Sequence, residues 1–247
     1  MEQNIPAKNR RRGIYLLPNL FTTAALFAGF YAITSAMNGH FEVAAVSIFV
    51  AMVLDGLDGR VARLTNTQSA FGAEYDSMAD MISFGAAPAL VMYTWALSQL
   101  GKAGWVAAFV HAAGAALRLA RFNTQIATQD KRYFQGLPSP SAAAILAGFV
   151  WVCVSHDIAV ENIRYVALGL AIFTGLLMVS NFRYYSFKDI DLRGRVSFIW
   201  AILIMLVFAF MFTNPPLVLF TLFSVYAVSG LVLTLGRRHR IRSERRS

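Results

Sequence analysis

Four aspartates fall in two pairs within one short stretch of the sequence. Asp55 and Asp58 are three residues apart, and Asp76 and Asp80 are four apart, so on helices each pair shares a helix face. Like charges this close repel one another unless a cation neutralises them. Carboxylate oxygens are hard ligands, which suit Mg²⁺ or Mn²⁺ and, less well, Ca²⁺. The spacing therefore predicts a divalent metal site, for one or two ions, held by these four aspartates.

Small and basic residues surround the aspartates. Gly56, Gly59 and Gly72 have no side chain, so a phosphate or a neighbouring backbone can come close to them. Ala62 keeps the same helix face thin, and Arg63 lies one helical turn beyond Gly59, where a guanidinium suits a phosphate oxygen. We expect a phosphate-bearing substrate beside the metal.

The alternative is that the aspartates are surface residues in salt bridges with Arg60 and Arg63. Two arginines do not balance four carboxylates together with Glu74, and the paired spacing would then be accidental. Metal binding accounts for both the excess of carboxylates and their paired spacing.

The elements that position these residues are expected to be membrane helices. The chain of 247 residues is 57% hydrophobic and 14% charged, whereas soluble domains carry about 25% charged residues. Its apolar residues fall in runs of about 20, the length that crosses a bilayer as a helix. We predict an all-α, polytopic bundle of about eight spans. They are placed at Leu17–Met37, Phe41–Gly59, Met78–Leu97, Ala103–Ala120, Ala142–His156, Val166–Asn181, Phe198–Phe212 and Leu217–Leu235.

The basic residues predict the orientation of the bundle. With both termini in the cytoplasm, 20 of the 22 Lys and Arg residues lie inside, and only Lys102 and Arg164 lie outside. A basic N-terminal segment 1–16, a membrane-embedded domain 17–236 and a basic tail 237–247 follow, in the cell membrane, with the aspartates on the cytoplasmic side. The net charge of +9 then favours contact with anionic headgroups over nucleic acid.

Cysteine and histidine suggest no further site. The single cysteine, Cys153, excludes an intrachain disulfide and is interpreted as a packing residue. His40, His111, His156 and His239 are scattered along the chain and are interpreted as structural.

The stretch from Asp55 to Asp80 resembles the signature of the CDP-alcohol phosphotransferase family, D-x-x-D-G-x-x-A-R-x8-G-x-x-x-D-x-x-x-D. The matching residues are Asp55, Asp58, Gly59, Ala62, Arg63, Gly72, Asp76 and Asp80. The resemblance implies two metal ions on the four aspartates and attack by an alcohol on the β-phosphorus of a CDP-alcohol, with CMP leaving. It also implies that Asp80 is the general base.

From Pro18 to Ala143 the chain is similar to the polytopic phosphatidylserine synthases of this family. The similarity rests on Pro18, Asn19 and Thr22 and on the segments Asp76–Pro88, Arg118–Asn123 and Phe134–Pro140. It implies CDP-diacylglycerol and L-serine as substrates and a homodimer. By the same resemblance the CDP-alcohol site would be formed by Asn19, Thr22, Asp55, Gly59, Ala62, Arg63, Ser69 and Gly72.

The acceptor is the more open question. Arg118, Arg121 and Asn123 are candidates to bind the serine carboxylate, although arginines at a helix end also snorkel to the membrane surface. Glycerol phosphate, inositol or inositol phosphate are alternative acceptors, and an archaeal ether lipid is an alternative donor. Glycerophosphate-type relatives usually have proline where this chain has Ser77, which favours serine. A divalent-cation transporter is a distant alternative, because carboxylates in membrane spans also mark ion pathways.

Overall fold

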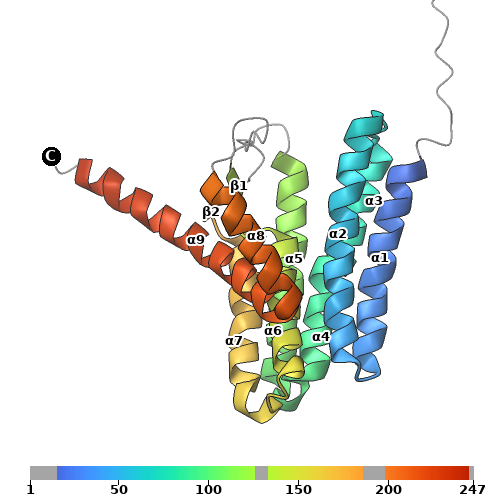
Figure 1. Cartoon of the computed structure of the whole chain (residues 1–247), viewed down its shortest axis with the longest axis vertical. Helices are drawn as coiled ribbons and strands as arrows, with labels where there is room; N and C mark the ends of the chain where they lie inside the picture. The colour runs from blue at the N-terminus through green and yellow to red at the C-terminus, as the bar shows by residue number, and fades with distance from the viewer. Residues whose placement is uncertain (1–15, 126–132, 186–197, 245–247) are drawn as a thin grey trace, which may run out of the picture.

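A computed structural model describes residues 16–125, 133–185 and 198–244, which form a helical bundle with one small β-ribbon (Figure 1). The N-terminal segment 1–15 and residues 245–247 of the predicted basic tail lie outside the described residues. The helical class predicted from the sequence is confirmed. The helices are α1 Leu16–Met37, α2 Phe41–Thr65, α3 Ala70–Asp80, α4 Ala87–Trp95, α5 Lys102–Gln125, α6 Ser139–Ser155, α7 Val160–Val179, α8 Phe198–Thr213 and α9 Pro215–Glu244.

Four helices in the described part of the chain are long and apolar enough to cross a membrane. These stretches are Leu17–Met37, Lys102–Thr124, Val160–Val179 and Pro215–Thr234. Each of the other four expected spans is helical, but α6 and α8 have only 17 and 16 residues, α2 carries charged residues at its second half, and the segment 78–97 is interrupted. The expected count of eight spans is therefore not confirmed by helix length and composition.

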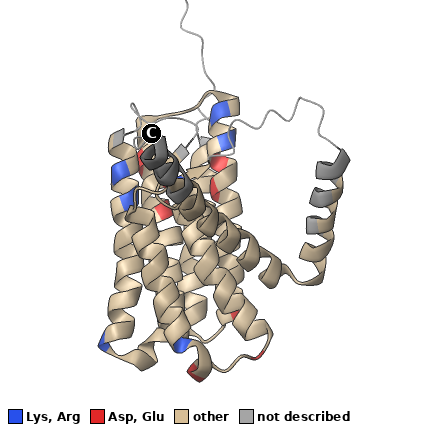
Figure 2. Ribbon diagram, turned by 90° about the vertical axis from the view of Figure 1, so that its left-hand side faces the viewer, with Lys and Arg blue, Asp and Glu red and all other residues tan. Residues whose placement is uncertain are grey.

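The charged residues of the described chain lie toward the two ends of the bundle, and the ribbon between them is largely uncharged (Figure 2). Charges are costly in the hydrocarbon of a bilayer, so this distribution is the one a membrane-embedded bundle requires. The aspartates of the signature stand at one end, on α2 and α3.

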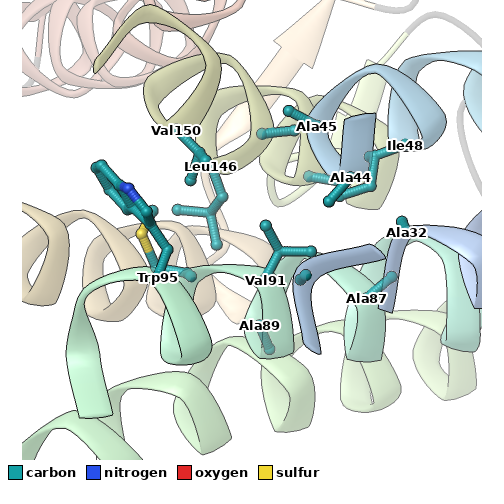
Figure 3. Close-up of a cluster of buried hydrophobic side chains, with 14 of the residues drawn as sticks. Ala32, Ala44, Ala45, Ile48, Ala87, Ala89, Val91, Trp95, Leu146 and Val150 are labelled. Carbon is teal, nitrogen blue, oxygen red and sulfur yellow. The ribbon is translucent and has the colours of Figure 1, made fainter. Parts of the chain in front are cut away.

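The core consists largely of small side chains. Ala32 on α1 and Ala44 and Ala45 on α2 are fully buried, and Val91 and Leu146 pack beside them from α4 and α6 (Figure 3). Small residues let helix backbones approach closely, which is the usual way that helices associate in membranes. The close contact of α1 with α2 fixes the position of the signature residues relative to α1.

The segment expected as one span at 78–97 is a rod with two irregular turns. α3 passes directly into a π-helical turn, η2 (Met81–Ala86), then α4, and then a short 3₁₀ turn, η3 (Leu97–Leu100). In η2 the Ala87 N–H donates to the carbonyl of Ile82, five residues earlier. The cause lies next to it, because Pro88 has no N–H for the carbonyl of Phe84 and its ring crowds that carbonyl.

A two-stranded ribbon, absent from the sequence prediction, ties α9 to the bundle. Strands β1 (Tyr133–Gln135) and β2 (Arg183–Tyr185) are antiparallel, with Phe134 opposite Tyr184. The fully buried Tyr184 donates from its hydroxyl to the carbonyl of Ala227, 3.1 Å away. A Cβ added at Gly230 would lie only 2.2 Å from the Tyr184 ring, so the ring and α9 meet where α9 has no side chain.

Candidate active site

Three carboxylates from α2 and α3 converge at one end of the bundle. Asp55, Asp76 and Asp80 each offer a carboxylate oxygen, and these oxygens all lie within 4.8 Å of one another. Asp76 Oδ1 is buried and has no hydrogen-bond partner among the described residues. An oxygen-only cluster with an unsatisfied buried acceptor fits a hard divalent cation.

Asp58, the fourth aspartate, is held from another helix. It is only 6% exposed, and its Oδ2 accepts a hydrogen bond of 2.8 Å from the Thr22 hydroxyl on α1. Its charge lies near that of Asp76, so it adjoins the three-carboxylate cluster. The spacing of the aspartates did not show this anchoring, because it depends on a residue 36 positions away.

The electrostatics of Asp76 reflect this crowding. Asp76 precedes the predicted span 78–97, and burial, together with the negative charges of Asp58 and Asp55, raises the pKa of its carboxyl to about 7. Among the described residues, neither Arg60 nor Arg63 forms an ion pair with the cluster. The alternative, in which the aspartates form surface salt bridges with Arg60 and Arg63, is therefore not supported by the structure.

A turn between α2 and α3 shapes the neighbouring surface. α2 ends at Thr65, and its C-cap Asn66 adopts a left-handed conformation with φ 51°. Ser69 caps α3, and its hydroxyl accepts a 3.0 Å hydrogen bond from the Gly72 N–H. A Cβ at Gly72 would lie 3.1 Å from that hydroxyl and 3.5 Å from Asn19 Oδ1. Glycine is thus the residue that keeps this junction open.

A pocket of about 350 Å³ lies between α1, α2 and α3, against Asp58 and Asp76. Seven of the eight residues predicted for a CDP-alcohol line it, and the eighth, Asp55, belongs to the carboxylate cluster. The lining residues are Pro18, Asn19, Thr22, Asp58, Gly59, Ala62, Arg63, Thr67, Gln68, Ser69, Gly72, Ala73 and Asp76. Sequence reasoning assigned no role to Thr67 and Gln68, although their place between the two halves of the signature was a usable signal. Gly56, expected to let a phosphate approach, does not line the pocket.

The three residues predicted to bind serine have different hydrogen-bond partners, although Arg118 and Arg121 line one small pocket together. Arg118 donates from Nη1 to Ser139 Oγ at 2.7 Å, its buried Nε has no partner among the described residues, and its charge is close enough to interact with Asp80. Arg121 is engaged with Asn181 Oδ1, at 2.6 Å, at the end of α7. Asn123 donates to Ser77 Oγ on α3, at 3.1 Å. Only Arg118 is thus placed against the carboxylate cluster.

Comparison with known proteins identifies a family and several similar sequences. The sequence profile of the CDP-alcohol phosphatidyltransferase family matches residues 15–177. A CDP-diacylglycerol–serine O-phosphatidyltransferase of Helicobacter pylori is 36% identical over 219 residues, which cover 89% of this chain and 91% of the relative. Proteins with the same name from Mycobacterium tuberculosis and Methanocaldococcus jannaschii are 41% and 40% identical, over 57% and 56% of this chain and 51% and 61% of their own lengths.

Proposed function

The chain belongs to the CDP-alcohol phosphatidyltransferase family, and from that premise we propose that it is a phosphatidylserine synthase. It transfers the phosphatidyl group of CDP-diacylglycerol to the hydroxyl of L-serine and releases CMP. The names of the bacterial and archaeal relatives support the choice of serine. The observation that carries the proposal is the convergence of Asp55, Asp76 and Asp80 beside the pocket formed by α1, α2 and α3.

A divalent metal, Mg²⁺ or Mn²⁺ bound as two ions, fits the carboxylate cluster. Asp55, Asp58, Asp76 and Asp80 would hold it, which would satisfy the buried oxygen of Asp76. When bound, the metal supplies neutralisation of the charge on the diphosphate.

The donor nucleotide is assigned to the 350 Å³ pocket. Asn19, Thr22 and Gly59 line it on the side of α1 and α2, and Ser69 and Gly72 line it at the start of α3. Arg63, exposed at its rim, is positioned for a phosphate oxygen. The diphosphate would then lie toward Asp58 and Asp76.

Asp80 is assigned as general base. The serine Oγ–P bond forms as the P–O bond to CMP breaks, and the serine hydroxyl proton passes to the Asp80 carboxylate. Arg118 is assigned to the serine carboxylate, because its Nε has no hydrogen-bond partner among the described residues and its charge interacts with that of Asp80. Arg121 and Asn123 would then contribute by holding α5 against α7 and α3.

We further propose the eight-span topology with both termini and the active site on the cytoplasmic side, in the cell membrane, and a homodimer. The orientation is supported by the distribution of basic residues.

The deciding experiment is a radiolabelled-serine assay on the purified protein in detergent with CDP-diacylglycerol and Mg²⁺ or Mn²⁺. Labelled phosphatidylserine and an equal amount of CMP are expected. Parallel reactions with inositol, inositol phosphate and glycerol phosphate should give little product. Release of CMP with one of these acceptors, but not with serine, would retain the family chemistry and reject serine. Metal uptake into vesicles without any CMP release would reject the enzyme in favour of a transporter.

A further inference from the structure

The π turn η2 begins at the residue after Asp80. Asp80 is the last residue of α3, and the turn continues without a break into α4. A π turn adds one residue to a helical rod, and one residue corresponds to about 100° of rotation. The directions in which Asp76 and Asp80 point, relative to the packed α4, therefore depend on this turn.

One carbonyl in the turn lacks its usual partner. In a regular α-helix the Phe84 carbonyl would accept from the N–H of residue 88, but that residue is Pro88. Phe84 is fully buried, so water does not replace the missing donor, and a buried carbonyl without a donor costs about 1–3 kcal/mol. A donor from another helix can replace the missing N–H.

His111 of α5 meets this carbonyl. Its ring is fully buried, with Nε2 3.4 Å from the Phe84 oxygen and Nδ1 2.8 Å from the Thr174 hydroxyl of α7. A carbonyl only accepts, so Nε2 carries the proton and donates to Phe84. With Nε2 protonated, Nδ1 of the neutral ring is an acceptor, so the single proton of the Thr174 hydroxyl points to Nδ1 and not to the carbonyls of Leu170 and Ala171, which lie 2.9 Å and 3.1 Å from the same oxygen.

The opposite side of the turn is held by α1. The Ser83 hydroxyl donates to the carbonyl of Ala25 at 3.1 Å. A Cβ at Gly29 would lie 2.6 Å from that hydroxyl and 2.8 Å from the Ser83 Cα, so α1 and η2 are in close backbone contact. The turn is thus held on one side by α1 and on the other by His111 of α5, which is bonded in turn to Thr174 of α7.

We propose that His111 is a positioning residue for the carboxylate cluster. By donating to the Phe84 carbonyl, in the orientation set by Thr174, it stabilises the π turn that directs Asp76 and Asp80 toward Asp55. Its effect on turnover rests on the proposed function, whereas its effect on cation binding by the aspartates does not.

The test compares three variants of the full-length protein in detergent. His111→Leu removes the donor at similar bulk, and His111→Gln restores an N–H donor on a flexible side chain. His156→Leu is the matched control, since His156 is exposed at the end of α6 and, among the described residues, its ring forms a hydrogen bond with the Val152 carbonyl of its own helix, 2.9 Å away. Mn²⁺ affinity is measured by electron paramagnetic resonance titration, and kcat and KM for both substrates are measured by CMP release.

His111→Leu is expected to weaken Mn²⁺ binding and to lower kcat by about 10- to 100-fold, the range for partners that orient metal ligands. The KM for CDP-diacylglycerol should change less than kcat, because the nucleotide pocket does not include η2. His111→Gln should recover most of both losses, and His156→Leu should match the wild type.

Different failures give different answers. Wild-type protein that binds Mn²⁺ but makes no phosphatidylserine, with weaker Mn²⁺ binding in His111→Leu, would reject the proposed function and support positioning. Unchanged Mn²⁺ affinity and kcat in His111→Leu would overturn the positioning role. If His111→Leu fails to fold, Thr174→Val, which removes only the orienting hydroxyl, should still lower Mn²⁺ affinity. Wild-type affinity in that variant, or loss of folding there as well, would overturn the proposal and assign His111 to stability alone.

Discussion

At the scale of single residues, the four signature aspartates are not equivalent. Asp55, Asp76 and Asp80 face one another, whereas Asp58 is anchored by the Thr22 hydroxyl at 2.8 Å. A carboxylate held by a hydroxyl has one oxygen engaged and the other oriented, which suits a fixed ligand. Asp80 interacts with the charges of Asp55 and Asp76 and also with that of Arg118, and on the proposed function it accepts the proton of the substrate hydroxyl.

Asp80→Asn is expected to lower kcat by about 10²- to 10⁴-fold, because asparagine keeps the shape and one oxygen but does not accept the hydroxyl proton. Equilibrium binding of CDP-diacylglycerol should stay close to that of the wild type. Asp58→Ala is the contrasting variant and should weaken metal and donor binding together. Near-normal turnover in Asp80→Asn would eliminate Asp80 as the base and direct attention to the exposed Glu74.

Removal of divalent metal is expected to abolish turnover, because the crowded carboxylates need a cation to remain ionised side by side. Activity after EDTA treatment, and its return with Mg²⁺ or Mn²⁺ in excess of the chelator, are the measurements. Undiminished CMP release in chelator would contradict the metal site.

Much of the site was predictable at this scale, because the signature fixes residue types at fixed spacing. Asn19 and Thr22 do line the pocket with Gly59 and Arg63. What spacing did not reveal were contacts between distant segments. The hydroxyl of Ser69 caps α3 while the residue lines the pocket, and Arg121, expected to face serine, is engaged with the end of α7.

At the scale of elements, the structure depends on close backbone crossings. A Cβ at Gly114 of α5 would lie 2.5 Å from the Gly175 carbonyl of α7, and one at Gly175 would lie 2.6 Å from the Val110 carbonyl. These glycines bring α5 and α7 together at the level of His111 and Thr174. Hydropathy located the helices, but it carries no information about the π turn, which arises from Pro88, or about the β-ribbon, whose strands are three residues each.

Gly175→Val is expected to lower the free energy of unfolding by about 1–3 kcal/mol, the usual cost of overpacking a tight contact. Gly169→Val, on the same helix, is the matched control, because a Cβ at Gly169 meets nothing within 4 Å. Thermal denaturation in detergent compares the two. Equal stability of the two variants would contradict the tight contact between α5 and α7 at Gly175.

At the scale of the whole molecule, the uncharged middle of the bundle separates two unlike ends (Figure 2). One end carries the aspartate cluster and its pocket. The other contains the turn at Gly39, with φ 79°, between α1 and α2, and the Glu42 carboxylate that accepts a hydrogen bond from Trp151 Nε1 at 3.1 Å. Composition predicted a membrane bundle, and runs of apolar residues predicted eight spans. Four helices of the described residues have the length and hydropathy of a span. Counting apolar runs therefore does not by itself establish the number of spans.

The orientation has a direct test. A reporter fused after Ser247 is expected in the cytoplasm, and a reporter inserted between Asn38 and Phe41 is expected outside, because 20 of 22 basic residues then lie inside. Protease accessibility in sealed vesicles reads out both positions. A C-terminal reporter on the outer side would contradict both the eight-span topology and the cytoplasmic active site.

The contact between His111 and Thr174 also bears on biosynthesis. All four aspartates have been synthesised once residue 80 has left the ribosome. The Thr174 hydroxyl that orients the His111 ring belongs to α7, which is synthesised much later. On the proposal made above, a nascent chain that ends before α7 carries all four ligands without their final arrangement. Full cation affinity would then arise only after α7 has inserted beside α5, so incomplete chains in the membrane would remain inactive.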